Sequence, residues 1–234
     1  MLLAVDTALS CCSLAIGDGK AAPLATRQLE LRYGHAERLM GLIAEALQDA
    51  GAAYDDLTGL AVSRGPGAFT GLRVGLAALQ GIALARNIPL LGLTTTEVIA
   101  AAAHRDGYEG ASLVVIDSRR AEPFCQLFHA NGDPMSEIEA IAGEDLPDWI
   151  ADRAEPVQMV LGDALDKLPE TLAQTLSAPK GYSTPDPSVM LSLAAETLGG
   201  KRPHSPATPL YIRPPDAARA KGLRQLADDG QAGR

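Results

Sequence analysis

The sequence has few aromatic residues, which limits how its core can be built. Phe, Trp and Tyr make up 4% of the 234 residues, whereas hydrophobic residues of all kinds make up 47%. The core is therefore expected to be aliphatic, and 23 glycines favour close helix packing and tight turns. The length allows one large domain or two small ones.

Cysteine and clustered positive charge are also scarce. The three cysteines, two of them adjacent at positions 11 and 12, do not form a disulfide framework and suit a reducing compartment. The formal net charge is −9, and the densest basic stretch, 213–224, is diluted by Asp216 and by alanines. We therefore expect no strong binding of DNA or RNA by this chain alone.

Segments that direct a chain to or through a membrane are not expected either. The longest stretch of low charge, 74–93, is broken by Gln80, Arg86 and Pro89. The first ten residues lack a basic segment and reach Asp6 after a short apolar run, unlike a signal peptide. These features predict a cytoplasmic protein with no membrane partner.

Metal-binding patterns are missing from the sequence. His35, His104, His129 and His204 are scattered, without HxExH or HExxH spacing, and no set of Cys and His has the spacing of a metal site. The sequence therefore predicts no metal ligands and no catalytic residues.

The apolar pattern predicts an α/β fold, a mixed sheet with flanking helices. Early strands are expected at 2–5, 12–16, 23–31, 57–63 and 89–93. Helices are expected at 35–50, 71–86, 94–104, 144–151 and 187–198. Later strands are expected at 113–117, 122–128 and 159–161. Gly17 to Gly19 indicates a hairpin turn, and Thr94 with Glu97 has the spacing of a capping box.

Two lobes are expected from this order of elements. The first takes residues 1–100 and about 205–215, because the short apolar segment PLYIR, 209–213, can dock back on it. The second is a reduced lobe of about 101–204, where the pattern is weaker. Residues 216–234 are expected to be a loose tail.

The segment RGPGAFTG, 64–71, joins a predicted strand to a predicted helix. Gly65 and Gly67 can adopt backbone angles that other residues avoid, and Thr70 is a candidate helix cap. A tight structural turn is one interpretation, and an anion site at a helix start is the other. The spacing is not GxGxxG, and the Lys-Ser/Thr of a phosphate loop is absent.

Asp6 and Thr7, at the end of the first predicted strand, are the second candidate site. A carboxylate there can hold hydrated Mg²⁺ near phosphates, but it can equally cap a turn. No glycine follows until Gly17. Together with Gly65, Gly67 and Thr70, these two residues are predicted to form at most a vestigial nucleotide or anion loop.

Two helices carry apolar residues on more than one face. Leu42, Val74 and Ile82 widen the apolar stripes of the helices that begin near His35 and Gly71. Packing on the sheet is the simpler interpretation, and a helical protein interface is the alternative.

Several segments together resemble the TsaB (YeaZ) family. They are LLAVDTALSCCSLAI, His35, SRGPGAFTGLRVGLAALQGIALA, IPLLGLTTTEVIA, VVIDSRRAE and PLYIR, and they lie mostly within residues 1–130. The resemblance implies a fold of the actin, Hsp70 and sugar-kinase group, which is ribonuclease H-like. It also implies a role in threonylcarbamoylation of adenosine 37 in tRNAs that read ANN codons.

In that family the paralogue TsaD carries the metal and the transfer chemistry, and the ATPase TsaE joins the assembly. The resemblance thus implies a non-catalytic subunit that binds TsaD and TsaE, or forms a homodimer alone, and meets tRNA through the complex. ATP and metal are expected on the partner subunits, and no cofactor is expected on this chain alone. The implied interface residues are His35, Leu39, Met40, Leu42, Ile43, Leu72, Gly75, Leu76, Leu79 and Ile82.

Two other functions remain open at this stage. Asp6 and the glycine-rich turn suit a stand-alone ATPase or small-molecule kinase of the same fold group. A peptidase is the third hypothesis, and the missing metal motif argues against it.

Overall fold

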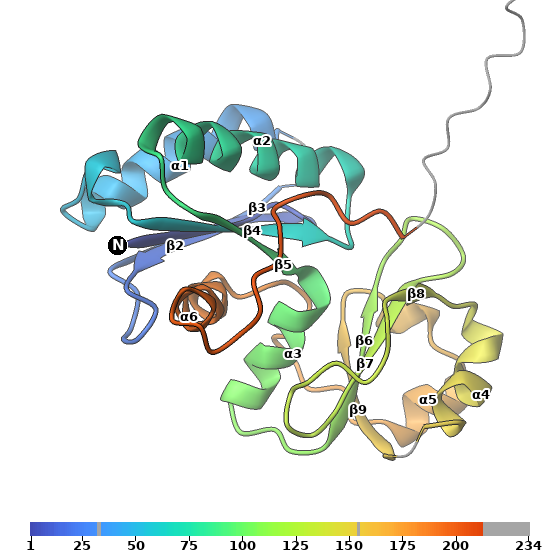
Figure 1. Ribbon diagram of the computed structural model, residues 1–234. Coiled ribbons are helices and arrows are strands. Elements are labelled where there is room, and N and C mark those ends of the chain that lie inside the picture. Colours follow the sequence, from blue (N-terminus) through green and yellow to red (C-terminus); the bar gives the residue numbers. More distant parts are fainter. Residues whose placement is uncertain (32–33, 154, 213–234) are drawn as a thin grey trace, which may run out of the picture.

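The computed structural model describes residues 1–31, 34–153 and 155–212. The first part of the chain forms a five-stranded mixed sheet (Figure 1). In sequence order its strands are β1 (Leu2–Asp6), β2 (Cys11–Gly17), β3 (Ala25–Glu30), β4 (Gly59–Gly65) and β5 (Leu90–Thr94). They lie in the order β3-β2-β1-β4-β5, with β1 antiparallel to β2 and parallel to β4.

Helices cover both faces of this sheet. On one face lie α1 (His35–Asp49) and α2 (Phe69–Arg86), and on the other lies α6 (Pro187–Leu198) (Figure 1). The alternation of side chains in β1 explains the two layers, because Leu3 and Val5 join the core under α1 and α2 while Leu2 and Ala4 join the core with α6. A residue pattern of period two thus becomes two separate hydrophobic layers.

A second, four-stranded sheet follows, in the order β8-β7-β6-β9. Its strands are β6 (Ala111–Ile116), β7 (Phe124–Phe128), β8 (Glu139–Ala140) and β9 (Val157–Gly162). The second sheet is accompanied by two short helices, α4 (Leu146–Ala151) and α5 (Glu170–Thr175), and by the 3₁₀ turns Gly143–Asp145 and Leu165–Lys167. A further 3₁₀ turn, Tyr54–Asp56, precedes β4 in the first sheet. Between the sheets lies α3 (Thr95–Arg105), whose start is the predicted capping box: the Glu97 amide donates to Thr94 Oγ1 at 3.1 Å.

Residues 205–212, called the C-terminal strap here, return to the first sheet. The Gly92 amide donates to the Ser205 carbonyl at 3.0 Å, and the Leu210 amide donates to the Arg64 carbonyl at 2.8 Å. The strap therefore covers part of the outer edge of β5, which protects an otherwise unpaired strand edge. This return was expected from the PLYIR segment, although Arg213 and the predicted loose tail lie outside the described residues.

The fold class predicted from the sequence, α/β with mixed sheets and flanking helices, is confirmed. One assignment within it is wrong: residues 187–198 were expected in the second lobe, but α6 packs on β1, β2 and β4 of the first sheet. The apolar pattern of α6 predicts burial without saying which sheet buries it. The lobe boundaries themselves stay a prediction.

Two local details also differ from expectation. β2 and β3 do pair antiparallel, but residues 18–24 connect them instead of a tight turn at Gly17 to Gly19. The Asp18 carboxylate holds this connection by accepting from the amides of Lys20 and Ala21 at 2.9 and 3.1 Å. No helix in the described ranges combines the length and the apolar character needed to cross a bilayer.

Candidate functional site

Asp6 and Thr7, the first predicted site, are completely buried at the end of β1. The Ala8 amide donates to Asp6 Oδ1 at 3.2 Å, whereas Asp6 Oδ2 has no hydrogen-bond partner. Ser13 lies directly opposite Asp6 on β2, and its Oγ is also without a partner. Burial raises the pKa of Asp6 to about 6, although hydrogen bonds from Ser63 and Ala8 oppose the rise.

The glycine-rich turn closes directly onto this loop. The Ala68 amide donates to the Ala8 carbonyl at 2.7 Å, and Thr7 Oγ1 donates to the Gly71 carbonyl at 2.8 Å. A Cβ added at Gly67 would overlap the Ala8 carbonyl, and one at Gly71 would overlap the Thr7 carbonyl. The glycines therefore let two backbone segments pack against each other, and carbonyl oxygens fill the space that an anion would need.

The predicted anion-loop residues are thus neighbours, but they are not an accessible loop. Asp6, Thr7 and Gly65 are buried. The predicted role of Thr70 as a helix cap is wrong, because α2 begins at Phe69 with Ala68 as its N-cap and has no side-chain cap. Thr70 instead lies exposed in the first turn of the helix.

An open apolar groove of about 480 Å³ lies between α1 and α2. Its lining residues are Ala36, Leu39, Met40, Phe69, Thr70, Arg73, Val74, Ala77 and Ala78. Met40 and Phe69 are 46% and 45% exposed, and further along the outer face of α2 Leu84 is 86% exposed. The outer side of α2 is therefore apolar and uncovered, although its inner side already packs on the sheet.

Most of the predicted interface residues do not lie on this outer surface. The buried ones are Leu39, Leu42, Ile43, Leu72, Gly75, Leu76, Leu79 and Ile82. They face the sheet because they form the regular apolar stripe that anchors each helix. Of the predicted interface residues, Met40 is exposed and His35 is half-buried. Leu39 is buried but also lines the groove, unlike the other buried members of the set.

Sequence reasoning missed Phe69, Arg73 and Ala77 as surface residues of the groove. A signal was available, since α2 has apolar residues on all sides, including Ala77, Gly81 and Leu84 outside the buried stripe. In a helix covered by the sheet alone, these positions would normally be polar.

An aromatic and cationic cluster connects the C-terminal strap to the groove. The ring centroids of Phe69 and Tyr211 lie 5.8 Å apart, and the Arg73 guanidinium lies 3.7 Å from the centre of the Phe69 ring. Arg73 also donates to the Tyr211 hydroxyl at 3.3 Å. The strap therefore reaches the groove at the first turns of α2.

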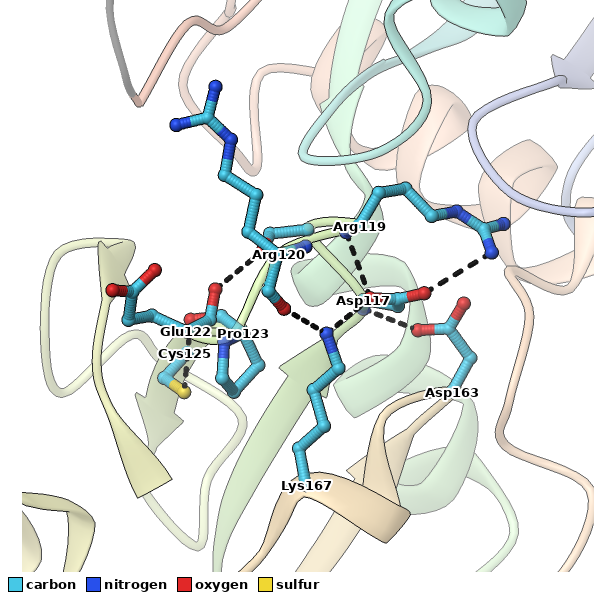
Figure 2. Close-up of polar contacts among 9 residues, drawn as sticks. Asp117, Arg119, Arg120, Glu122, Pro123, Cys125, Asp163 and Lys167 are labelled. Atoms are coloured by element: carbon cyan, nitrogen blue, oxygen red, sulfur yellow. Dashed lines mark hydrogen bonds and ion pairs between the residues drawn. The ribbon is translucent and has the colours of Figure 1, made fainter. Parts of the chain in front are cut away.

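A second polar site lies where β6 and β9 end (Figure 2). Asp163 Oδ1 accepts from the Asp117 amide at 2.7 Å, and Lys167 Nζ lies 2.6 Å from Asp117 Oδ1. Arg119 pairs with Asp117 Oδ2 at 3.2 Å. Burial opposes ionisation of Asp117, but Lys167 and Arg119 outweigh it and hold the pKa below its usual value. The charge of Arg119 is therefore balanced within its own loop.

The cysteines and acidic residues offer no reactive cluster within the described ranges. Burial raises the pKa of Cys12 and of Cys125 to about 12, so neither thiol ionises readily near neutral pH. In the part of the chain that the structure describes, no three His, Cys, Asp or Glu side chains are grouped so as to hold a metal ion.

Comparison with known proteins assigns the chain to a family. A family model described as TsaD, tRNA N6-adenosine threonylcarbamoyltransferase, matches residues 30–184, more than half of the chain. The chain belongs to this family. Its relatives within the family are TsaB (YeaZ) proteins, so the resemblance predicted from the sequence is confirmed.

The TsaB relatives match about half of the chain. The Escherichia coli protein named tRNA threonylcarbamoyladenosine biosynthesis protein TsaB is 34% identical over 127 residues, 53% of this chain and 52% of that protein. The chain thus spans about half the length of the curated TsaB relatives that it matches. An uncharacterized protein of Mycobacterium tuberculosis is 32% identical over 187 residues, 78% of this chain and 77% of that protein.

A solved YeaZ structure from Pseudomonas aeruginosa matches over most of its length. Its TM-score is 0.72 at 25% identity, and the match covers 90% of this chain and 98% of that one. The TsaB (YeaZ) fold therefore includes both sheets, and the groove between α1 and α2 lies on a fold that this family shares.

Proposed function

We propose that this chain is a non-catalytic subunit that binds a TsaD homologue through the groove between α1 and α2. In this role it supports threonylcarbamoylation of adenosine 37 in tRNAs reading ANN codons, with a TsaE homologue joining the complex. The names of its TsaB relatives support the pathway. The observation that carries the proposal is the uncovered apolar side of α2, where Leu84 is 86% exposed.

The chemistry of this surface suits a helical partner. Gly41 and Gly81 have open space where a Cβ would lie, so a second helix can approach the backbone of either helix closely. Ala36, Ala77 and Ala78 add small side chains beside them. Arg73 is the charged side chain of the lining, and its guanidinium already lies over Phe69. A partner helix with an apolar face would bury the alanines and Phe69, and an acidic side chain at its edge would pair with Arg73.

The same surface would serve a homodimer when no TsaD homologue is present. A paralogue with the same fold presents equivalent helices, so a self-complementary contact and a heterodimeric contact compete for one groove. Native mass measurement of the chain alone and mixed with TsaD and TsaE homologues from the same organism tests the proposal. A heterodimer in the mixture is expected, and its absence at micromolar concentrations would contradict the proposed role.

Restoration of tRNA modification is the functional part of the test. Purified TsaD and TsaE homologues, supplied with threonylcarbamoyl adenylate as the donor and with ATP, are expected to modify tRNA efficiently only when this chain is added. Equal modification with and without the chain would argue against a supporting subunit even if a complex forms.

The alternative function, a stand-alone ATPase or kinase, has little geometric support. Asp6, its proposed magnesium ligand, is completely buried beneath the turn formed by residues 65–71. Titration calorimetry of the isolated chain with millimolar Mg·ATP separates the two functions. Heat of binding that disappears in the Asp6→Ala variant would favour the alternative.

A further inference from the structure

The C-terminal strap is fastened along α2 as well as along β5. Gln80 Nε2 donates to the Ala207 carbonyl at 3.1 Å, and Arg73 donates to the Tyr211 hydroxyl at 3.3 Å. Gln80 and Arg73 are both exposed and lie seven residues apart, which is about two helical turns, so they share one side of α2. The strap therefore borders the exposed side of α2 and places Tyr211 beside the groove.

Arg73 is held from two sides but forms no ion pair within the ranges that the structure describes. Its guanidinium lies 3.7 Å from the centre of the Phe69 ring, and the Phe69 and Tyr211 rings lie 5.8 Å apart. Most other described arginines pair with a carboxylate, namely Arg27, Arg86, Arg105, Arg119 and Arg202. Arg73 thus differs from them in having an aromatic setting without an acidic partner.

The remaining donors of Arg73 are suited to a carboxylate. A guanidinium has five N–H donors in a planar fork, and the bond to the Tyr211 hydroxyl uses one of them. The side chain is exposed, so a ligand can reach the others. Because Phe69 and Tyr211 already restrict the guanidinium, a bidentate bond to a carboxylate costs less conformational entropy than it would with a free arginine.

The charges on the neighbouring helix α1 leave Arg73 available. Glu45 pairs with Arg27 at 3.9 Å. Glu37 and Arg38 are adjacent, exposed and opposite in sign, so they nearly cancel at a distance. Arg73 is the one charged side chain among the residues that line the groove. The groove therefore has a positive end, although the formal net charge of the chain is −9.

We propose that the C-terminal strap is part of the docking surface, and that Phe69 and Tyr211 hold Arg73 to receive a carboxylate of the partner. This inference rests on the proposed function, because the TsaD homologue is the partner that supplies the Asp or Glu. A protein is favoured over an RNA phosphate, since a single arginine at an apolar groove lacks the basic surface that RNA requires. Clusters of arginine and aromatic residues commonly contribute most of the affinity of an interface.

Titration calorimetry with a TsaD homologue tests the role of Arg73. At about 0.05 M salt, Arg73→Gln is expected to bind about 30-fold more weakly than the native chain, and Tyr211→Phe about fivefold more weakly. Arg153→Gln is the matched control, because the Arg153 guanidinium lies 4.8 Å from the centre of the Trp149 ring, beside the second sheet. The control should bind as the native chain does, and all four chains should melt at similar temperatures.

The salt dependence distinguishes a receptor for a carboxylate from an apolar contact. Raising the salt to about 0.5 M should weaken the native chain more than it weakens Arg73→Gln, which has lost the ion pair. Arg73→Glu should bind poorly to the native TsaD homologue. It should regain binding to one member of a panel of TsaD variants in which single Asp or Glu residues are replaced by Arg.

The outcomes separate this inference from the proposed function. Equal affinities of the native chain and Arg73→Gln, or equal salt dependence, would overturn the inference and leave the proposed function intact. The inference is also wrong if Arg73→Gln weakens self-association of the chain but not binding of TsaD, because the carboxylate would then come from a second copy. If none of the chains binds TsaD, the proposed function fails and the inference fails with it.

Discussion

Replacing Asp6 with Asn is expected to stabilise the protein at neutral pH. Asp6 is completely buried, and its Oδ2 has no hydrogen-bond partner. Burial raises the pKa of Asp6 to about 6 from its ordinary value of 3.8, so the folded protein disfavours the charged carboxylate. The contribution of the protonated form to stability is fully present below pH 3.8 and is lost as the pH rises through 6.

The size of the effect follows from the pKa shift. A shift of about two units corresponds to about 3 kcal/mol between the two limits, and about half of this is lost between pH 5 and pH 8. Asn keeps an acceptor for the Ala8 amide and carries no charge, and its amide group can donate toward Ser13 or Ser63. The variant should therefore gain stability relative to the native chain as the pH rises.

Urea unfolding at several pH values between 5.5 and 8 measures this difference. The native chain and Asp6→Asn are compared with Asp148→Asn, which removes an exposed carboxylate from α4. The free energy of unfolding of Asp6→Asn should exceed that of the native chain by an increasing amount toward pH 8. Parallel pH profiles for all three proteins would refute the argument that a buried, poorly solvated carboxylate lies at the end of β1.

Further predictions concern the close backbone packing and the second polar site. Gly71→Ala should destabilise the chain by about 2 kcal/mol or more, because the added Cβ would overlap the Thr7 carbonyl. Gly81→Ala lies at an open helical position and should stabilise the chain by about 0.5–1 kcal/mol. Thermal unfolding of the pair checks this, and similar melting temperatures would contradict it. Lys167→Met should raise the pKa of Asp117, measured by NMR titration, and lower stability by about 1 kcal/mol above pH 5. An unchanged Asp117 titration would show that Arg119 alone sets its pKa.

The elements of the first sheet could be predicted from sequence because their signals are local. Alternating or continuous apolar runs, the Thr94–Glu97 capping box and the start of α1 at His35 all depend on neighbouring residues. The position of α6 could not be predicted in this way. The apolar residues of α6 could be buried against either sheet. The helix packs on the first sheet because the chain returns there from the second sheet.

In the candidate sites, too, local features could be predicted from the sequence, whereas tertiary packing could not. The sequence identified Asp6, Thr7 and the glycine-rich turn as neighbours, but not that carbonyl groups would fill the space between them. It identified α1 and α2 as the helices of interest, yet most of the chosen residues belong to the buried stripe. The composition of a helix predicts that it has apolar residues on two sides. Which side packs on the sheet depends on how the chain crosses from one strand to the next, and composition does not show this.

The proposed docking surface is tested most directly by a charge placed in the groove. Gly75 and Leu76, which the family resemblance placed at the interface, are buried, so a large substitution at either position would disrupt the monomer. Ala77 is exposed and lines the groove, and Ala173 on α5 provides an exposed alanine in a helix outside it.

Titration calorimetry of a TsaD homologue with the native chain, Ala77→Arg and Ala173→Arg is the decisive measurement. We predict that Ala77→Arg weakens binding by about 100-fold, or about 2.7 kcal/mol, because the buried guanidinium would lack a partner. Ala173→Arg should bind as the native chain does, and all three chains should melt at similar temperatures. Equal affinities for all three would show that the partner docks elsewhere on the chain.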